Sequence, residues 1–316
     1  MDDQEIEDDQ EKQDDQRELL LKIARCEIAN ERLNLLIREK GKIDLESHDC
    51  NAVCKFQYDK IYHELVENGP EHEVTKAMFH VPEPWNGNLK TAEILFVGSN
   101  PSIDLNEEDF PKFESEEWAE DKKDGVVDFF SNRLDRLKLG DIKETRYWCG
   151  IYKYAAYILG EVGAVKTIEF GDKKKRKIDS RIALTEIVHC KSKDETGVPE
   201  AARKCFDKHT NEVIDYFLKT PLRSGKKKIV IFVGAKARNR LCELGGIKPK
   251  KATRDQIANI CNNELFEEYR DSASFLLLPY PFANQWTFWK PEKPEEHYLN
   301  DDRRTKLIAK ELEQYG

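Results

Sequence analysis

Four short apolar segments, separated by helical patterns, are the feature that most limits how this chain can fold. The segments occupy residues 94–97, 183–188, 229–233 and 275–278. Between them, residues 200–218 and residues 254–269 carry apolar side chains at the spacing of a helix. Continuous apolar strands that alternate with helices are typical of a parallel sheet whose two faces are both covered. We therefore predict an α/β fold, namely an α/β/α sandwich around a central four-stranded, mostly parallel sheet.

The chain before the first strand differs in composition from the rest. Residues 1–16 are acidic and rich in glutamine, which favours a disordered tail. Residues 17–39 carry apolar side chains at helical spacing, and we predict a helical N-terminal extension over residues 17–85, followed by the α/β domain over 86–316. Because the acidic start carries most of the net charge of −9, the rest of the chain is nearly neutral.

The sequence also indicates a cellular compartment. No stretch approaches the roughly 18 apolar residues that a membrane-spanning helix needs. The acidic start is the opposite of a secretory signal peptide, which has a basic end followed by an apolar segment. We therefore expect a cytoplasmic protein with no membrane partner, in which the eight cysteines are reduced thiols.

Small and polar residues gather where the predicted strands end. In open α/β sheets, ligands bind beyond the carboxyl ends of the strands. The residues found there are Gly98, Ser99, Asn100, Pro101 and Ser102 on the first strand, Glu186 on the second, Lys236 on the third, and Tyr280, Pro281, Asn284 and Trp286 on the fourth. The sequence therefore predicts a functional site at this edge of the sheet.

These residues resemble the signatures of the uracil-DNA glycosylase superfamily. Gly98-Ser99-Asn100-Pro101 is similar to its first signature, a Gly-x-Asp/Asn-Pro turn. The segment LTEIVHCKS, residues 184–192, is similar to its base-reading strand, and residues 279–282 stand in the place of its second signature. The resemblance implies a monofunctional DNA glycosylase that flips a nucleotide out of DNA, hydrolyses its N-glycosidic bond and leaves an abasic site.

The resemblance also implies roles for individual residues. Asn100 would orient the attacking water, although its amide could equally do no more than stabilise the turn. Gly98 and Ser99 would hold the base. Tyr280 stands where the superfamily commonly has a histidine, and a tyrosine hydroxyl cannot carry a positive charge near neutral pH. Contacts to DNA are implied for Pro101, Ser102, Lys236, Pro281, Asn284 and Trp286.

Glu186 aligns with the asparagine that reads uracil in the superfamily. An ionised carboxylate only accepts hydrogen bonds, so it would accept from the N4 amine of a cytosine and repel the O4 of uracil. We therefore expect a modified cytosine as substrate, such as glucosylated hydroxymethylcytosine in phage DNA, and a role in antiviral defence. The alternatives are repair of uracil or another deaminated base, and a catalytically silent nucleic-acid-binding module. For Glu186 itself, the alternative is a structural salt bridge.

Two further groups of residues are candidates for contact with DNA. Phe129 and Phe130 could form a stacking platform for the flipped base, or they could belong to an ordinary helix core. The basic run that includes Lys173, Lys174 and Lys175 could contact phosphates, or it could be a solvated loop.

The cysteines raise the question of a cofactor. Some members of the superfamily hold an iron–sulfur cluster on two early and two later cysteines, and Cys50, Cys54, Cys190 and Cys205 occur in that order. Three residues separate the first two cysteines, however, where those members have two, and Cys205 falls at an apolar position of a helical pattern. We therefore expect buried thiols with neither metal nor cofactor, and the cluster is the alternative.

Overall fold

The computed structural model divides the chain into two compact units, and each of them combines segments that are far apart in the sequence. Unit 1 contains Met1–Asn86, Ser99–Asn132 and Thr185–Tyr216, whereas unit 2 contains Gly87–Gly98, Arg133–Leu184 and Phe217–Gly316. The described residues are 15–68, 73–102, 110–113, 123–136, 146–159, 178–222 and 227–278.

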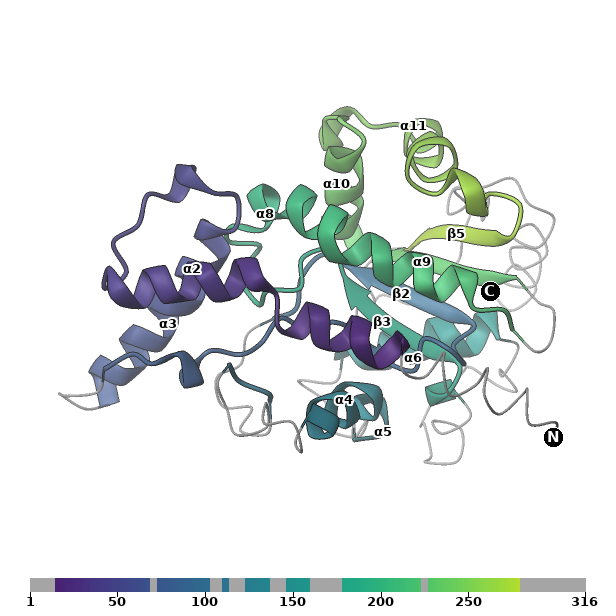
Figure 1. Ribbon diagram of the computed structural model, residues 1–316. Coiled ribbons are helices and arrows are strands. Elements are labelled where there is room, and N and C mark those ends of the chain that lie inside the picture. Colours follow the sequence, from purple (N-terminus) through teal and green to yellow (C-terminus); the bar gives the residue numbers. More distant parts are fainter. Residues whose placement is uncertain are drawn as a thin grey trace. The chain divides into compact units, whose positions relative to one another are not determined.

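A five-stranded sheet forms the centre of unit 2 (Figure 1). Its strand order is β1-β3-β2-β4-β5, and the pairs β2–β4 and β4–β5 are parallel, with Phe96 opposite Ile231 and Ile231 opposite Leu276. The strands are β1 (Asn86–Gly87), β2 (Ile94–Gly98), β3 (Ile182–Glu186), β4 (Lys228–Val233) and β5 (Ala273–Leu278).

The α/β class and the four predicted strands are confirmed, but the sheet has five strands and not four. The additional strand, β1, has two residues, which is too short to produce a periodic pattern in the sequence. Gly87 adopts a φ of 92°, and a Cβ atom there would lie 2.7 Å from the carbonyl oxygen of Ile182. Glycine thus permits the close approach of β1 to β3.

Apolar side chains pack against both faces of the sheet, which explains why its strands are continuously apolar. On one face, Ile151 and Tyr152 of α6 (Arg146–Ile158) form a cluster with Phe96, Ile231 and other strand residues. On the other face, the Phe266 ring stacks on Phe232 and Phe275, with centroid distances of 6.4 and 5.1 Å. Unit 2 also contains α5 (Arg133–Arg136), α10 (Gly234–Leu244) and α11 (Arg254–Asn259).

Unit 1 is mainly helical in its described part. The predicted helix over 17–39 is in fact two helices, one over residues 15–24 and α2 (Glu27–Arg38), with Cys26 at the N-cap of α2. The predicted helix over 200–218 is interrupted by a π-helical turn, which shifts the helical phase without ending the helix. The other helices here are α3 (Asn51–Asn68), α4 (Lys123–Ser131), α8 (Val198–Cys205), the π-helical turn Phe206–Thr210, and α9 (Asn211–Lys219), which continues into unit 2.

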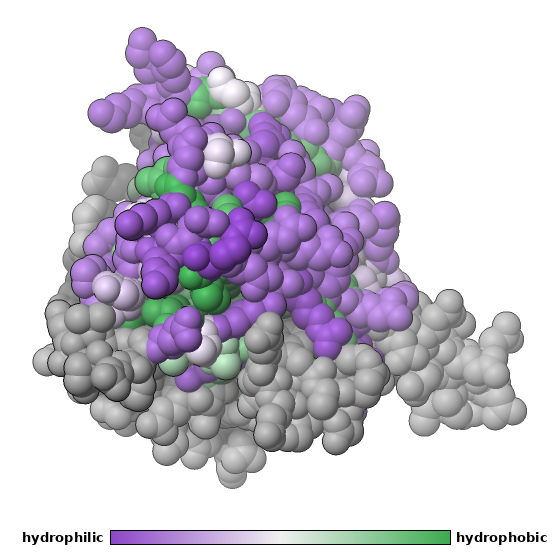
Figure 2. Space-filling model, turned by 60° about the vertical axis from the view of Figure 1, so that its left-hand side comes forward, coloured by the Kyte–Doolittle hydropathy of each residue, from purple (hydrophilic) through white to green (hydrophobic). Residues whose placement is uncertain are grey.

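The visible surface agrees with the high content of charged residues. On the face shown in Figure 2, hydrophilic side chains dominate, and apolar residues reach the surface only in small patches between them. Among the described helices, none is both long enough and apolar enough to cross a membrane.

Gly197, at the start of α8, lies close to the backbone of α3. It precedes α8 with a φ of 73°, and a Cβ atom there would lie 2.3 Å from the backbone nitrogen of Val53 and 2.6 Å from the carbonyl carbon of Ala52. Because both neighbours are backbone atoms, no side-chain rotation can relieve the overlap. Only glycine therefore allows α8 and α3 to pack in this way.

We predict that Gly197→Ala lowers the free energy of unfolding far more than Gly246→Ala does. Gly246 has a similar φ of 68° but no atom within 4 Å of the added Cβ, so its substitution introduces only backbone strain, about 1 kcal/mol. Gly197→Ala adds a backbone overlap to the same strain. Urea unfolding of both variants measures the difference, and equal losses would contradict the close approach.

Candidate functional site

The predicted site residues of β2 and β3 are followed by two chain segments that are hydrogen-bonded to each other. The carbonyl oxygen of Ser99 accepts a bond of 2.9 Å from the backbone N–H of Val188, and that of Pro101 accepts one of 3.1 Å from Ser192. These four residues all belong to unit 1. The turn after β2 is thereby held directly against the loop after β3.

The Asn100 side chain is fixed by two hydrogen bonds. Its Nδ2 donates to the Oγ of Ser192 at 2.9 Å and to the carbonyl oxygen of Pro101 at 3.0 Å. Within the described residues, no donor pairs with its Oδ1. The amide therefore stabilises the turn and also keeps an acceptor oxygen in a set direction.

Glu186 is a buried carboxyl group at the end of β3. Glu186 is only 7% exposed. Among the described residues, its Oε2 has no hydrogen-bond partner. Burial, together with the nearby carboxyl groups of Glu83 and Glu195, holds the pKa of Glu186 well above its usual value. This shift favours the neutral, protonated acid, whereas the sequence analysis expected an ionised carboxylate.

The buried lysine near this site pairs with another glutamate. Lys191 is 1% exposed, and its Nζ lies 3.6 Å from Oε2 of Glu83 and 3.3 Å from the centre of the Phe110 ring. The other carboxylate oxygen of Glu83 accepts a bond of 2.6 Å from Nδ2 of Asn86. In the described part of the chain no lysine or arginine forms a salt bridge with Glu186, so the structural alternative for that residue gains no support.

His189 connects the loop after β3 to the segment that carries Glu83. Its Nδ1 lies 2.7 Å from the carbonyl oxygen of Glu83 and must donate to it, and its Nε2 lies 3.2 Å from Oγ1 of Thr210. Burial lowers the pKa of His189 to about 4 in spite of the bond to the Glu83 carbonyl, so the ring is neutral near pH 7. This histidine positions the loop and carries no charge.

Glu195 reaches the site from a strained part of the same loop. Asp194 and Glu195 have φ values of 56° and 65°, which are uncommon for residues other than glycine. Oε2 of Glu195 accepts a bond of 2.9 Å from the hydroxyl group of Ser99. The loop conformation therefore places a third carboxyl group next to the first signature turn.

Phe129 and Phe130 pack as a helix core. Both rings meet Phe110 edge to face, at centroid distances of 5.3 and 5.6 Å, and they are 7% and 0% exposed. Phe130 therefore has no free face in this arrangement, and the structure favours the helix-core alternative over a stacking platform.

The remaining predicted residues differ in their exposure, and some of them lie outside the described part of the chain. Gly98 and Pro101 are buried, Ser102 is exposed, and Lys236 is exposed in the first turn of α10 in unit 2. The predicted contacts that lie outside the described residues are Lys173, Lys174, Lys175, Tyr280, Pro281, Asn284 and Trp286.

The sequence did not single out Glu83, Lys191, Ser192 or Glu195 as site residues. Lys191 and Ser192 end the segment LTEIVHCKS, so charged and polar residues just after an apolar strand were the available signal. Glu83 lies between two prolines far upstream, and Glu195 depends on an unusual backbone conformation. Neither feature produces a spacing that could be recognised in advance.

Comparisons with known proteins give no family assignment. No protein-family model matches the chain, and no curated protein is similar enough in sequence to indicate a relative.

We predict that Glu186→Gln makes the protein more stable than the wild type, by a margin that grows with pH. In the unfolded chain Glu186 ionises above about pH 4.3, whereas the folded protein retains the proton up to the raised pKa. The folded state binds more protons in that range, so wild-type stability falls as the pH rises, and the glutamine variant lacks this loss. Urea unfolding at several pH values measures the effect.

The control for this experiment is Glu268→Gln, which changes an exposed glutamate in the same way. Its free energy of unfolding should change with pH in parallel with that of the wild type. A parallel curve for Glu186→Gln as well would show that Glu186 is ionised in the folded protein.

Proposed function

We propose that this protein is a DNA glycosylase that hydrolyses the N-glycosidic bond of a modified pyrimidine and leaves an abasic site. The observation that carries the proposal is the geometry of Asn100, whose amide is held by two hydrogen bonds while its Oδ1 keeps a free acceptor position. The resemblance of residues 90–290 to the uracil-DNA glycosylase superfamily implies that this amide orients the attacking water. We propose with it an α/β/α sandwich that acts on DNA in the cytoplasm.

The reaction requires an oriented water molecule more than a strong base. When the bond between base and deoxyribose breaks, positive charge develops on the sugar and negative charge on the base. Oδ1 of Asn100 accepts a hydrogen bond from the water and directs its oxygen towards the sugar carbon. A weak nucleophile is sufficient for a sugar cation, because correct positioning supplies much of the rate.

Glu186 suits the departing base because it is neutral. A protonated carboxyl group donates one hydrogen bond and still accepts others, whereas an ionised one would repel a base that is becoming negative. A donor aimed at the developing charge lowers the barrier to bond cleavage. Burial, and after it the carboxyl groups of Glu83 and Glu195, raises the pKa of Glu186, so this acid stays protonated and serves as a donor.

The neutral acid also affects the choice of substrate. Its hydroxyl and carbonyl oxygens are complementary to N3 and the N4 amine of cytosine, and equally to O4 and N3–H of uracil. We still propose a modified cytosine as the substrate, such as glucosylated hydroxymethylcytosine in phage DNA, with a role in antiviral defence. The reason is the resemblance of residues 98–101 to the Asn-type first signature. Uracil or another deaminated base is the second candidate, and the protonated form of Glu186 is compatible with it as well.

We predict that Asn100→Ala abolishes most base release while DNA affinity is nearly unchanged. Orientation of the water matters in the transition state and hardly in the bound state, and its loss should reduce the single-turnover rate by on the order of a hundredfold. Plain, uracil-containing, hydroxymethylated and glucosylated DNAs are incubated with the protein and cleaved with alkali, and the released base is identified by mass.

The matched control is Asn132→Ala, at an exposed position of unit 1, which should retain the full rate. If Asn100→Ala retained more than about a third of the rate, Asn100 would not position the water. If the wild type bound DNA but released no base from any of the four substrates, the protein would be a binding module.

A second prediction concerns Glu186 and the base. Glu186→Gln preserves one donor and one acceptor and should keep base release within about tenfold of the wild type, whereas Glu186→Met removes both and should lose about a hundredfold. Single-turnover rates on matched oligonucleotides measure this. Equal losses in the two variants would show that an ionised carboxylate is required.

A further inference from the structure

The partly exposed carboxyl group of Glu195 lies beside the turn that carries Asn100. Its Oε2 accepts a hydrogen bond of 2.9 Å from Oγ of Ser99, the residue immediately before Asn100. Ser192, three residues earlier in the same loop, accepts a bond of 2.9 Å from Nδ2 of Asn100. One loop of unit 1 therefore supplies both a partner that fixes the amide and a carboxyl group next to it.

The loop that carries this carboxyl group is anchored where it begins. Oγ1 of Thr210 lies 2.9 Å from the carbonyl oxygen of Ile187 and 3.2 Å from Nε2 of His189. The backbone N–H of Val188 donates to the carbonyl oxygen of Ser99 at 2.9 Å. These contacts attach the start of the loop both to the π-helical turn and to the turn after β2.

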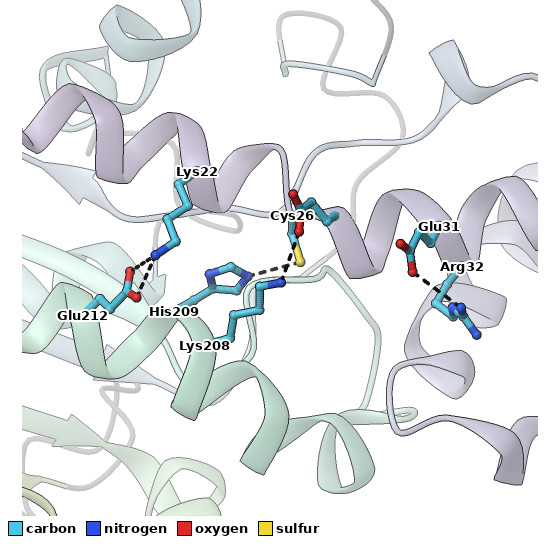
Figure 3. A network of polar contacts seen from close by, with 8 residues as sticks. Lys22, Cys26, Glu31, Arg32, Lys208, His209 and Glu212 are labelled. Carbon is cyan, nitrogen blue, oxygen red and sulfur yellow. Dashed lines mark hydrogen bonds and ion pairs between the residues drawn. The ribbon is translucent and has the colours of Figure 1, made fainter.

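The loop is also anchored where it ends. Gly197 lies close to the backbone of α3, and α8 then leads through the π-helical turn into α9. This helical segment contacts the N-terminal helices: Nζ of Lys22 lies 2.7 Å from both carboxylate oxygens of Glu212, and Nε2 of His209 lies 3.1 Å from Sγ of Cys26 (Figure 3). A loop that is held at both ends keeps its carboxyl group in one place, as preorganised stabilisation of charge requires.

Glu195 and Glu186 have different surroundings, and these favour different charge states. Burial, and after it the carboxyl groups of Glu83 and Glu195, holds the pKa of Glu186 well above its usual value. Glu195 is reached by solvent and accepts a bond from the Ser99 hydroxyl, and both features favour its ionised form. Two carboxyl groups, one neutral and one charged, are suited to different tasks in one reaction.

Cleavage of a glycosidic bond offers two such tasks. Negative charge develops on the base, to which the neutral Glu186 can donate, and positive charge develops on the deoxyribose. The water that Asn100 directs attacks the sugar carbon, so the sugar lies next to the turn after β2 and near the carboxylate of Glu195. A negative charge at this place attracts the sugar more strongly in the transition state than in the neutral substrate, and it therefore lowers the barrier.

We propose that the ionised carboxylate of Glu195, held by the Ser99 hydroxyl, stabilises the positive charge that develops on the deoxyribose during base release. This inference rests on the proposed function and adds a residue to it. Asn100 directs the water, Glu186 donates to the base, and Glu195 complements the charge of the sugar.

The test measures binding to two DNA duplexes that carry a stable analogue in place of one deoxyribose. One analogue is a pyrrolidine, whose amine is protonated, and the other is a neutral tetrahydrofuran. The wild type should bind the cationic duplex about tenfold more tightly than the neutral one, because only the former resembles the charged sugar.

Glu195→Gln keeps an acceptor for the Ser99 hydroxyl but removes the charge. It should lose the preference for the cationic duplex, and its single-turnover rate of base release should fall by about tenfold as well. Its affinity for the neutral duplex should be unchanged or higher, since a negative charge near the phosphates is lost. Slower chemistry without weaker binding is not expected from mere loss of structure.

Two further variants separate charge from position. Ser99→Ala keeps the charge of Glu195 but removes the hydroxyl that holds it, and should lose about threefold of the preference. The matched control is Glu200→Gln, which removes the charge of an exposed glutamate in the first turn of α8 and should keep the full preference.

The outcomes distinguish this inference from the proposed function. Base release by a wild type that binds the two duplexes equally would overturn the inference and leave the proposed function standing, and so would a Glu195→Gln variant that keeps the preference. A wild type that shows the preference but releases no base from any substrate would overturn the proposed function, and with it the role of Glu195 in bond cleavage.

Discussion

The buried ion pair between Lys191 and Glu83 is the interaction around which the candidate site is arranged. A lysine that is 1% exposed has lost nearly all its water, and such a charge costs several kcal/mol unless a partner compensates it. Glu83 and the ring of Phe110 supply that compensation. Since Lys191 pairs with Glu83, no lysine or arginine of the described residues forms a salt bridge with Glu186, and burial raises the pKa of Glu186 without a compensating cation.

The loop that carries Lys191 joins several features through consecutive residues. His189 bonds to the backbone of Glu83, and Cys190 lines a small cavity together with three other cysteines. Lys191 pairs with the Glu83 side chain, and Ser192 holds the amide of Asn100. A change in the conformation of this loop would therefore affect the carboxyl groups, the amide and the thiols together.

A protonated glutamate changes what this site can recognise. Burial holds the pKa of Glu186 well above its usual value, and the nearby carboxyl groups of Glu83 and Glu195 raise it further, because a second negative charge close by disfavours ionisation. The structure thereby converts a residue type that normally only accepts hydrogen bonds into one that also donates. In the reaction that we propose, a protonated Glu186 donates a hydrogen bond to the negatively charged base, which an ionised carboxylate would repel.

The sequence by itself determined the class of fold and the place of the candidate site. Continuous apolar segments form strands wherever both faces of a sheet are covered, so β2, β3, β4 and β5 were predictable, and so was the position of Asn100 just beyond a strand. The sequence could not show β1, which is two residues long, or the π-helical turn within the pattern of 200–218, which keeps the helix but changes its phase.

Only the tertiary structure decided the charge state of Glu186 and which cysteines lie together at one cavity. The charge state depends on burial and on Glu83, which is distant in sequence from Glu186, and the cavity brings Cys26 close to Cys50, Cys190 and Cys205. Electrostatic interactions and ligand geometry depend on distances in space, and a local sequence pattern does not contain those distances.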